Sequence, residues 1–178
     1  MFNNFLAEAV NLCQGFLPVD MAAGANDGDY ISLKNYRRCA VILFKEPGVA
    51  GNDPVITLTQ ALNVAGSGTT KPLTVQRVWK KQAATNLLAV GQYTKSTPAD
   101  PAANDTFSTN TWTNSDLAEQ AGIIIVEVMA EDLDIANGYD CFKAAIADVG
   151  TAGQVGALLY ALYDPKFQSD PLPSGIVD

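Results

Sequence analysis

The chain has 178 residues, of which 48% are hydrophobic and only 17% are charged. A chain of this length fits one domain and can fill its own apolar core. Its formal net charge of −8 disfavours contact with nucleic acid and with anionic membranes, so we expect neither among its partners. The charged fraction is below the usual quarter, which indicates that something other than water covers part of the surface.

The sequence lacks the residues that most catalytic and metal sites use. Histidine is absent, and with it the commonest general base and metal ligand. Three widely spaced cysteines, Cys13, Cys39 and Cys141, are interpreted as small buried residues of a protein in a reducing compartment. No apolar run approaches the ~18 residues of a membrane span, and the first residues lack the positive start of a signal peptide. We expect no enzyme activity, no cofactor and no bound metal.

Residues 1–15 predict an N-terminal helix or arm. Asn3 or Asn4 can cap a helix that ends near Cys13, before Gly15. Apolar side chains recur at helical spacing, at Phe2, Phe5, Leu6, Ala9, Val10 and Cys13. Such a stripe must lie against other atoms, either in its own domain or in a neighbouring subunit.

Residues 16–164 predict one all-β domain. Short apolar or alternating runs, separated by turns rich in Gly and Pro, predict about eight strands, with the first beginning at Gly15. Their ranges are 15–19, 30–33, 39–44, 55–62, 73–81, 123–129, 141–148 and 154–163. The last two are expected to pair as a hairpin. This pattern predicts an antiparallel two-sheet β-sandwich of Greek-key or jelly-roll type, followed by an extended tail at 165–178.

Two polar segments are candidates for contact with a partner. Lys34, Arg37 and Arg38 form a basic cluster in an acidic chain, either as a solvated loop or as a contact for an acidic surface. Residues 91–114 are polar, with Tyr93, Phe107 and Trp112 as large anchors. They form either a long surface excursion carrying a hairpin or a tip that meets a partner.

The segment 131–140 is rich in oxygen ligands, at Glu131, Asp132, Asp134, Asn137 and Asp140. It does not fit an EF-hand loop, because Ala136 and Lys143 stand where oxygen ligands are needed, although an irregular calcium site stays open. The same segment resembles a tyrosine corner, in which a tyrosine two residues before a cysteine bonds back to the backbone; here these would be Tyr139 and Cys141.

Several stretches together resemble a family of small virion proteins of tailed phages, the capsid decoration or cement proteins. The matching stretches are Tyr30-Ile31-Ser32-Leu33-Lys34-Asn35-Tyr36 before the strand at 39–44, residues 55–61 with 64–68, and residues 124–129 with the corner and the closing strand. The resemblance implies a β-sandwich bound to the outer face of an icosahedral shell in the virion, assembled in the host cytoplasm. It implies the major capsid protein as partner, often with a homotrimeric arrangement, and no enzyme.

Under this interpretation the chain ends and the basic cluster make the contacts. The expected contact residues are Phe2, Phe5, Leu6, Val10, Arg37, Arg38, Phe167 and Leu172. The alternative function is a tail-associated or surface-exposed module that recognises carbohydrate or a host receptor. In that case Tyr93, Phe107 and Trp112 would be its stacking platforms.

Overall fold

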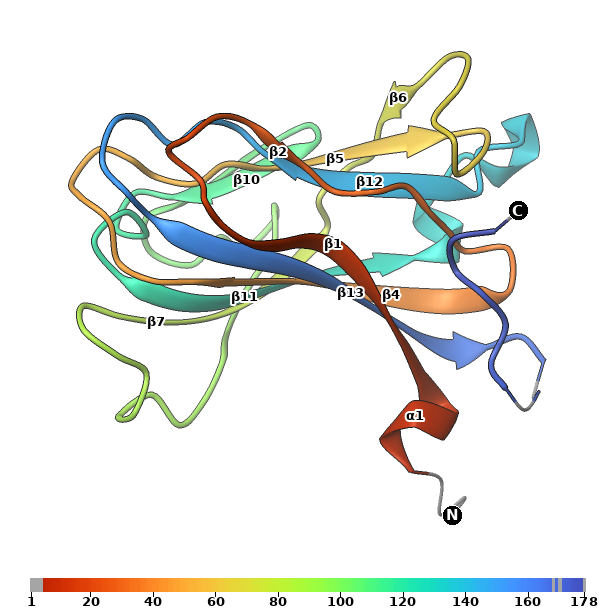
Figure 1. Ribbon diagram of the computed structural model, residues 1–178, viewed down its shortest axis with the longest axis horizontal. Helices are drawn as coiled ribbons and strands as arrows, with labels where there is room; N and C mark the ends of the chain where they lie inside the picture. The colour runs from red at the N-terminus through yellow and green to blue at the C-terminus, as the bar shows by residue number, and fades with distance from the viewer. Residues whose placement is uncertain (1–4, 168, 170, 178) are drawn as a thin grey trace.

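The computed structural model describes residues 5–167, 169 and 171–177, and it confirms the predicted all-β sandwich. Two antiparallel sheets lie face to face, and the single short helix α1 (Leu6–Ala9) stands below them at one end (Figure 1). Within the described ranges no helix is long and apolar enough to cross a membrane. Phe2, one of the expected contact residues, lies outside the described residues.

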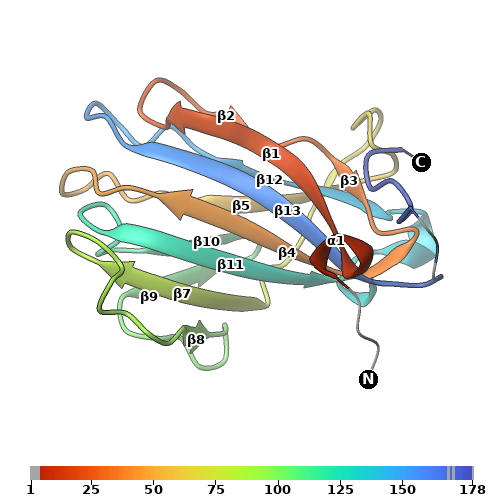
Figure 2. The same ribbon diagram turned by 60° about the horizontal axis from the view of Figure 1, so that its bottom comes forward.

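The first sheet has six strands, which Figure 2 shows side by side. In spatial order these are β1 (Val10–Asp20), β13 (Val155–Pro165), β4 (Tyr36–Lys45), β11 (Ala121–Met129), β7 (Arg77–Ala83) and β8 (Thr94–Ser96). The apolar runs predicted at 39–44 and 123–129 are the central strands β4 and β11, which pair along their length. Their even-numbered and odd-numbered residues alternate between the two faces, as the period of a strand requires.

The second sheet has seven strands, several of them only two residues long. Its main order is β2 (Asn26–Asp27), β12 (Cys141–Ile146), β5 (Ile56–Ala61), β10 (Thr111–Asn114) and β9 (Asp105–Ser108), while β3 (Ile31–Ser32) pairs with β12 and β6 (Lys71–Pro72) with β5. The orders β1-β13-β4-β11 and β2-β12-β5-β10 face each other, which is the jelly-roll arrangement of two Greek keys. The described strands exceed the eight predicted because β2, β6, β8, β9 and β10, of two to four residues each, are not among the predicted ranges.

The predicted hairpin between 141–148 and 154–163 is wrong. β12 and β13 belong to opposite sheets, so the loop between them crosses from one sheet to the other. Gln154 holds this crossing in place: its backbone N–H donates to Asp20 Oδ1 (2.8 Å), and its side-chain Nε2 donates to the Ala118 carbonyl (3.1 Å). Those partners are remote in sequence, so a local turn pattern could not reveal them.

The predicted N-terminal helix is wrong beyond Ala9. Val10 begins β1, which pairs with β13 from the Val10–Tyr163 pair to the Asp20–Val155 pair. A strand forms here because the backbone edge of β13 would otherwise be unpaired, and backbone N–H and C=O groups must find partners. The three-residue spacing of Val10 and Cys13 favours a helix, because in a strand it puts the two side chains on opposite faces, and pairing with the sheet edge outweighs this pattern.

The described part of the tail packs against the sandwich, which corrects the prediction of an extended, unpacked segment. The Gly175 carbonyl accepts from the Ser32 N–H (2.7 Å), and the Pro173 carbonyl accepts from the Tyr36 hydroxyl (2.5 Å) and from Asn11 Nδ2 (3.0 Å). Gly175 is buried beside Leu162 and Cys13, where a Cβ atom would lie only 2.8 Å from Leu162 Cδ1. The tail therefore closes the end of the core next to β1.

The core between the sheets is built from the inward side chains of both. It includes Val41 and Leu43 of β4, Ile124 and Val126 of β11, Leu158 and Leu162 of β13, Ile56 and Leu58 of β5, Trp112 of β10 and Phe142 of β12. Cys39 and Cys141 are also buried, and none of the three cysteines forms a disulfide.

Tyr160 of β13 joins the two sheets through the core. Its hydroxyl accepts a hydrogen bond from the Ala144 N–H of β12 (2.9 Å), at the point where the edge strand is interrupted between β2 and β3. Gly28 passes over this contact, and a Cβ there would lie 2.4 Å from the Tyr160 hydroxyl and 2.7 Å from the Ala144 carbonyl oxygen. Only glycine leaves room for the phenol at this site.

We predict that Tyr160→Phe lowers the free energy of unfolding by about 1–3 kcal/mol, because it leaves the Ala144 N–H buried without a partner. Chemical denaturation measures the change. Tyr93→Phe is the matched control, since that side chain is partly exposed and should lose little. Equal stability of Tyr160→Phe and the parent chain would show that the bond contributes nothing.

Candidate interaction surfaces

The two chain ends meet at one apolar hollow of about 380 Å³. It is lined by Leu6, Ala7, Val10, Asn11, Leu12, Pro171 and Leu172. We call it the end hollow. The bond from Asn11 to the Pro173 carbonyl fixes the tail beside β1 and so shapes one wall. Three of the expected contact residues, Leu6, Val10 and Leu172, therefore come together, although they are far apart in the sequence.

The remaining apolar contact candidates stand in the open. Phe5, which precedes α1, is 79% exposed, and Phe167 of the tail is 67% exposed. Leu6 is 68% exposed although it lines the hollow. No side chain of α1 is buried, so these apolar groups gain little from their own domain. An exposed apolar arm of this kind is typical of a segment that packs on a partner.

The basic cluster is largely neutralised by its own chain. Arg37 Nη1 lies 3.2 Å from Asp164 Oδ1, and Arg38 Nε lies 4.0 Å from Asp164 Oδ2. Lys34 contributes its carbonyl, which accepts from Lys166 Nζ (2.9 Å). Exposed pairs of this kind are weak and exchange partners readily, so they leave Arg37 and Arg38 available to an acidic group.

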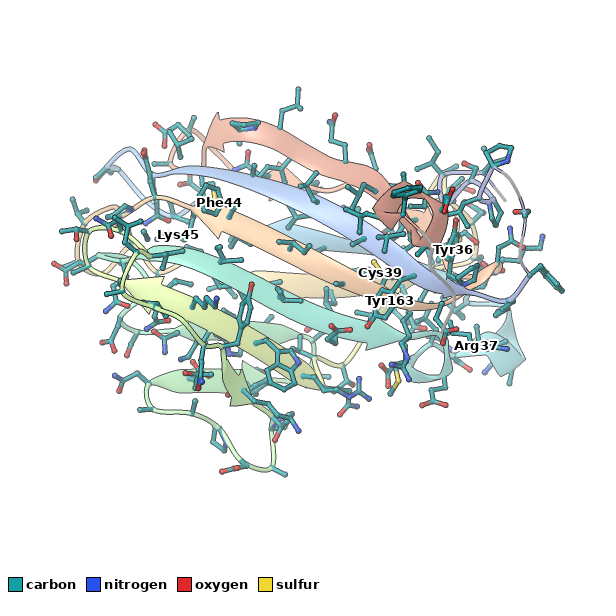
Figure 3. All side chains as sticks on the ribbon, turned by 90° about the horizontal axis from the view of Figure 1, so that it is seen from below. Tyr36, Arg37, Cys39, Phe44, Lys45 and Tyr163 are labelled. Atoms are coloured by element: carbon teal, nitrogen blue, oxygen red, sulfur yellow. The ribbon has the colours of Figure 1, made fainter. Side chains whose placement is uncertain are left out.

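The outer face of the six-stranded sheet is apolar, and we call it the open face. In Figure 3 it faces the viewer, and the neighbours Phe44 and Lys45 of β4 point to opposite sides of the sheet. Phe44 is 59% exposed, Leu12 55% and Leu159 44%. Half-buried or small apolar side chains fill the positions between them: Ala40, Ile42, Trp79, Ile123, Ile125, Ala157 and Ala161.

The outer face of the seven-stranded sheet is polar by contrast. Its outward positions are Thr57, Thr59, Thr106, Ser108, Thr111, Thr113 and Lys143. Threonine suits a strand whose outer side meets water, because it is β-branched and still polar. The sandwich thus has one side suited to water and one side suited to burial.

Charges on the open face are mostly basic, in a chain that is acidic as a whole. Arg38, Arg77, Lys81 and Lys95 surround the apolar centre, with Glu127 among them. The hydroxyl of Tyr163 donates to Glu127 Oε2 (2.5 Å), and burial, together with that carboxylate, raises the pKa of Tyr163 to about 12. Arg38, Arg77, Trp79, Glu127, Met129 and Tyr163 line a shallow hollow of about 270 Å³.

The carboxylates at 132 and 134 in the acidic corner are held by groups of the chain itself. Asp132 accepts from the Met129 N–H (2.8 Å) and from Arg77 (3.2 Å), and Asp134 pairs with Lys71 at 2.6 Å. The Lys71 ammonium and then the Asn137 amide lower the pKa of Asp134. The described residues hold no cluster of three potential metal ligands among His, Cys, Asp and Glu.

The tyrosine-corner prediction places the bond on the wrong tyrosine. Tyr139 packs under Lys71, whose Nζ lies 4.4 Å from the ring centroid. The tyrosine hydroxyl that joins the sheets through a backbone N–H belongs to Tyr160. Gly138 takes the left-handed conformation (φ 84°) and ends the turn at residues 135–137.

The stacking platform predicted at 91–114 does not form. Trp112 is fully buried in the core, and Phe107 packs against the core from β9. Only Tyr93 is substantially exposed, and Lys81 Nζ lies 4.5 Å from the centroid of its ring. The polar residues around Trp112 are the outward side of β10, and β9 and β10 form the hairpin that this segment was expected to carry.

Two buried lysines were missed by the sequence interpretation. Lys80 pairs with Asp105 at 2.5 Å, and Asn114 Nδ2 also donates to Asp105 Oδ1 (2.8 Å). Lys45 donates to the carbonyls of Leu117 (2.6 Å) and Gln120 (2.5 Å). Inward and outward side chains alternate along β7 and β4, and this alternation could have indicated that both lysines point inward. Both lysines anchor loops, which explains them without a catalytic role.

Comparison of the chain with protein-family models, with curated proteins and with solved structures finds no match. The candidate surfaces therefore have to be interpreted from their own geometry and composition.

Lys45 gives a pH-dependent prediction. Burial lowers its pKa to about 8, although Asp53 and Glu46 oppose the shift. Between pH 8 and the pKa of ~10.5 of a lysine in the unfolded chain, the unfolded chain binds more protons than the folded chain. The free energy of unfolding therefore rises with pH over this range, and the added stability is lost as the pH falls through 8. From about pH 8 to pH 9.5 we expect the native chain to gain ~1 kcal/mol relative to Lys45→Met.

Urea denaturation across this pH range measures the difference. Lys34→Met is the control, because that lysine is exposed and its replacement should leave the slope unchanged. Parallel pH profiles for the parent chain and Lys45→Met would contradict the assigned pKa.

Proposed function

We propose that the protein is a virion structural protein that binds the outer surface of an icosahedral phage capsid and stabilises it. The observation that carries the proposal is the convergence of both chain ends on one apolar hollow, with Leu6, Val10 and Leu172 in its wall. An exposed apolar arm and an adjoining hollow fit a peptide or loop of the major capsid protein. The motif resemblance supplies the choice of that partner.

The charge and the shape of the molecule fit the same role. A net charge of −8 keeps it from the packaged nucleic acid, and the threonine-rich outer sheet can face solvent while other surfaces are covered. A protein that binds only the mature shell stabilises that shell by its binding free energy. Many symmetry-related copies would add modest contacts into a large effect.

We predict that deletion of residues 1–9, or Leu172→Asp, reduces occupancy on shells assembled from the major capsid protein of the same genome by at least ~10-fold, because each change removes or charges an apolar contact. Co-sedimentation of purified protein with shells measures occupancy. The deletion stops before Val10 so that the edge strand β1 stays intact.

Thr113→Asp, on the polar outer face, is the matched control and should bind normally. Normal occupancy of both end variants would exclude the end hollow as the contact. Absence of binding by the parent chain would reject the proposed function. Particles without the protein should also break at lower temperature, whereas loss of adsorption to the host with unchanged particle strength would favour the receptor-binding alternative.

A further inference from the structure

None of the residues that the structure describes covers the centre of the open face. Phe44 and Leu159 stand out from the centre of a six-stranded sheet, and the half-buried Ile42, Ile123 and Ile125 surround them. Helix α1 stands at the Tyr163 end of β13, away from Phe44, and leaves the centre uncovered (Figures 2 and 3). A monomeric protein rarely exposes a contiguous apolar surface of this extent.

We propose that the open face binds the open face of a second copy of this chain, in a two-fold symmetric pair. The size of the face fits this occupant. Five of its strands, spaced ~4.8 Å apart, with about eight residues each at ~3.3 Å, cover ~600 Å² per copy. A pair buries at least ~1,200 Å², which reaches the range of specific protein interfaces.

The charges select one of the two possible symmetry axes. An axis across the strands would place β7 over β7 of the second copy. Arg77 and Lys81 of both copies would then lie close together, and their like charges would repel. An axis parallel to the strands, between β4 and β11, places the basic β7 over the neutral β13 of the other copy. It also places Arg38 next to Glu127 of the second copy, twice in each pair.

The second axis determines which side chains face each other across the pair. Residues in register across the sheet share one level: Leu159, Ile42, Ile125 and Trp79 form one level, and Ala161, Ala40, Glu127 and Arg77 form the next. Rotation therefore places Leu159 over Trp79 of the second copy and the small Ala161 under the long Arg77. The first level is an apolar contact between large side chains, and the second sets a long side chain over a small one.

We predict that the purified chain has twice its 18.8 kDa mass at tens of micromolar in light scattering or analytical ultracentrifugation. Phe44→Lys and Leu159→Lys should each weaken the pair by at least ~100-fold and give monomers, because each buries an ammonium group close to the basic β7 of the second copy, which carries Arg77 and Lys81. Both side chains are exposed in the single chain, so unchanged melting of the variants will show that folding is intact.

Thr59→Asp, on the polar outer face, is the control and should stay paired. A parent chain that remains a monomer overturns the proposal, as does an assembly that survives Phe44→Lys. A three-chain mass, as the family resemblance implies, also overturns it. None of these results involves a capsid, so failure here is distinct from failure of the proposed function.

Chemical crosslinking tests the axis. Chains with Leu159→Cys and chains with Trp79→Cys, made separately and mixed, should be joined by a short bis-maleimide, because these positions face each other across the pair. Leu159→Cys alone should not crosslink above the level of the parent chain, whose Cys13 is partly exposed. Efficient crosslinking of Leu159→Cys to itself would show the other axis and overturn the arrangement.

Discussion

The hydrogen bond between the Tyr160 hydroxyl and the Ala144 N–H is the contact on which the arrangement of the two sheets depends. A sandwich is usually held by apolar contact alone, which tolerates sliding of one layer over the other. A phenol that crosses the core to one particular backbone N–H fixes the register between β13 and β12. The contact also explains the interrupted edge strand: the Gly28 N–H still donates to the Ala144 carbonyl (2.9 Å), but the Ala144 N–H donates to Tyr160, so the reciprocal ladder bond is missing between β2 and β3.

The distribution of polarity is partly inverted relative to an ordinary sandwich. Lys45 and Lys80 point into the interior, where they hold the 117–120 turn and Asp105, while isoleucine, phenylalanine and tryptophan point outward from the same strands. Burying a lysine costs free energy unless its ammonium is fully bonded, and here carbonyls or a carboxylate supply those bonds. The lysines thus rigidify one end of the sandwich, and the outward residues beside them, Phe44 and Lys81, lie on a firmly held surface.

Local pattern predicts the strands of this fold but not their partners. The apolar runs at 39–44 and 123–129 are central strands, and alternation finds β5 and β7. The assignment of 141–148 and 154–163 to one hairpin failed, because the side-chain pattern of a strand does not say which sheet it joins. The N-terminal helix failed for a related reason, since only the free edge of β13 makes a strand preferable at Val10. The end hollow was predicted only in part. The sequence identified the apolar residues of both ends, but it did not show the bond from Asn11 to Pro173 that brings them together.

The outward apolar residues of the six-stranded sheet are not needed to build that sheet. The seven-stranded sheet carries threonine at its outward positions, such as Thr57, Thr59 and Thr111, and pairs its strands in the same antiparallel way. Threonine in place of Ile42 or Ile125 would meet the same backbone requirements, because both residue types are β-branched and favour strands. The fold therefore does not explain Phe44 and Leu159, which cost solubility and contribute nothing to the core. A partner surface that covers Phe44 and Leu159 accounts for them, and the basic side chains around them restrict the charge of that surface.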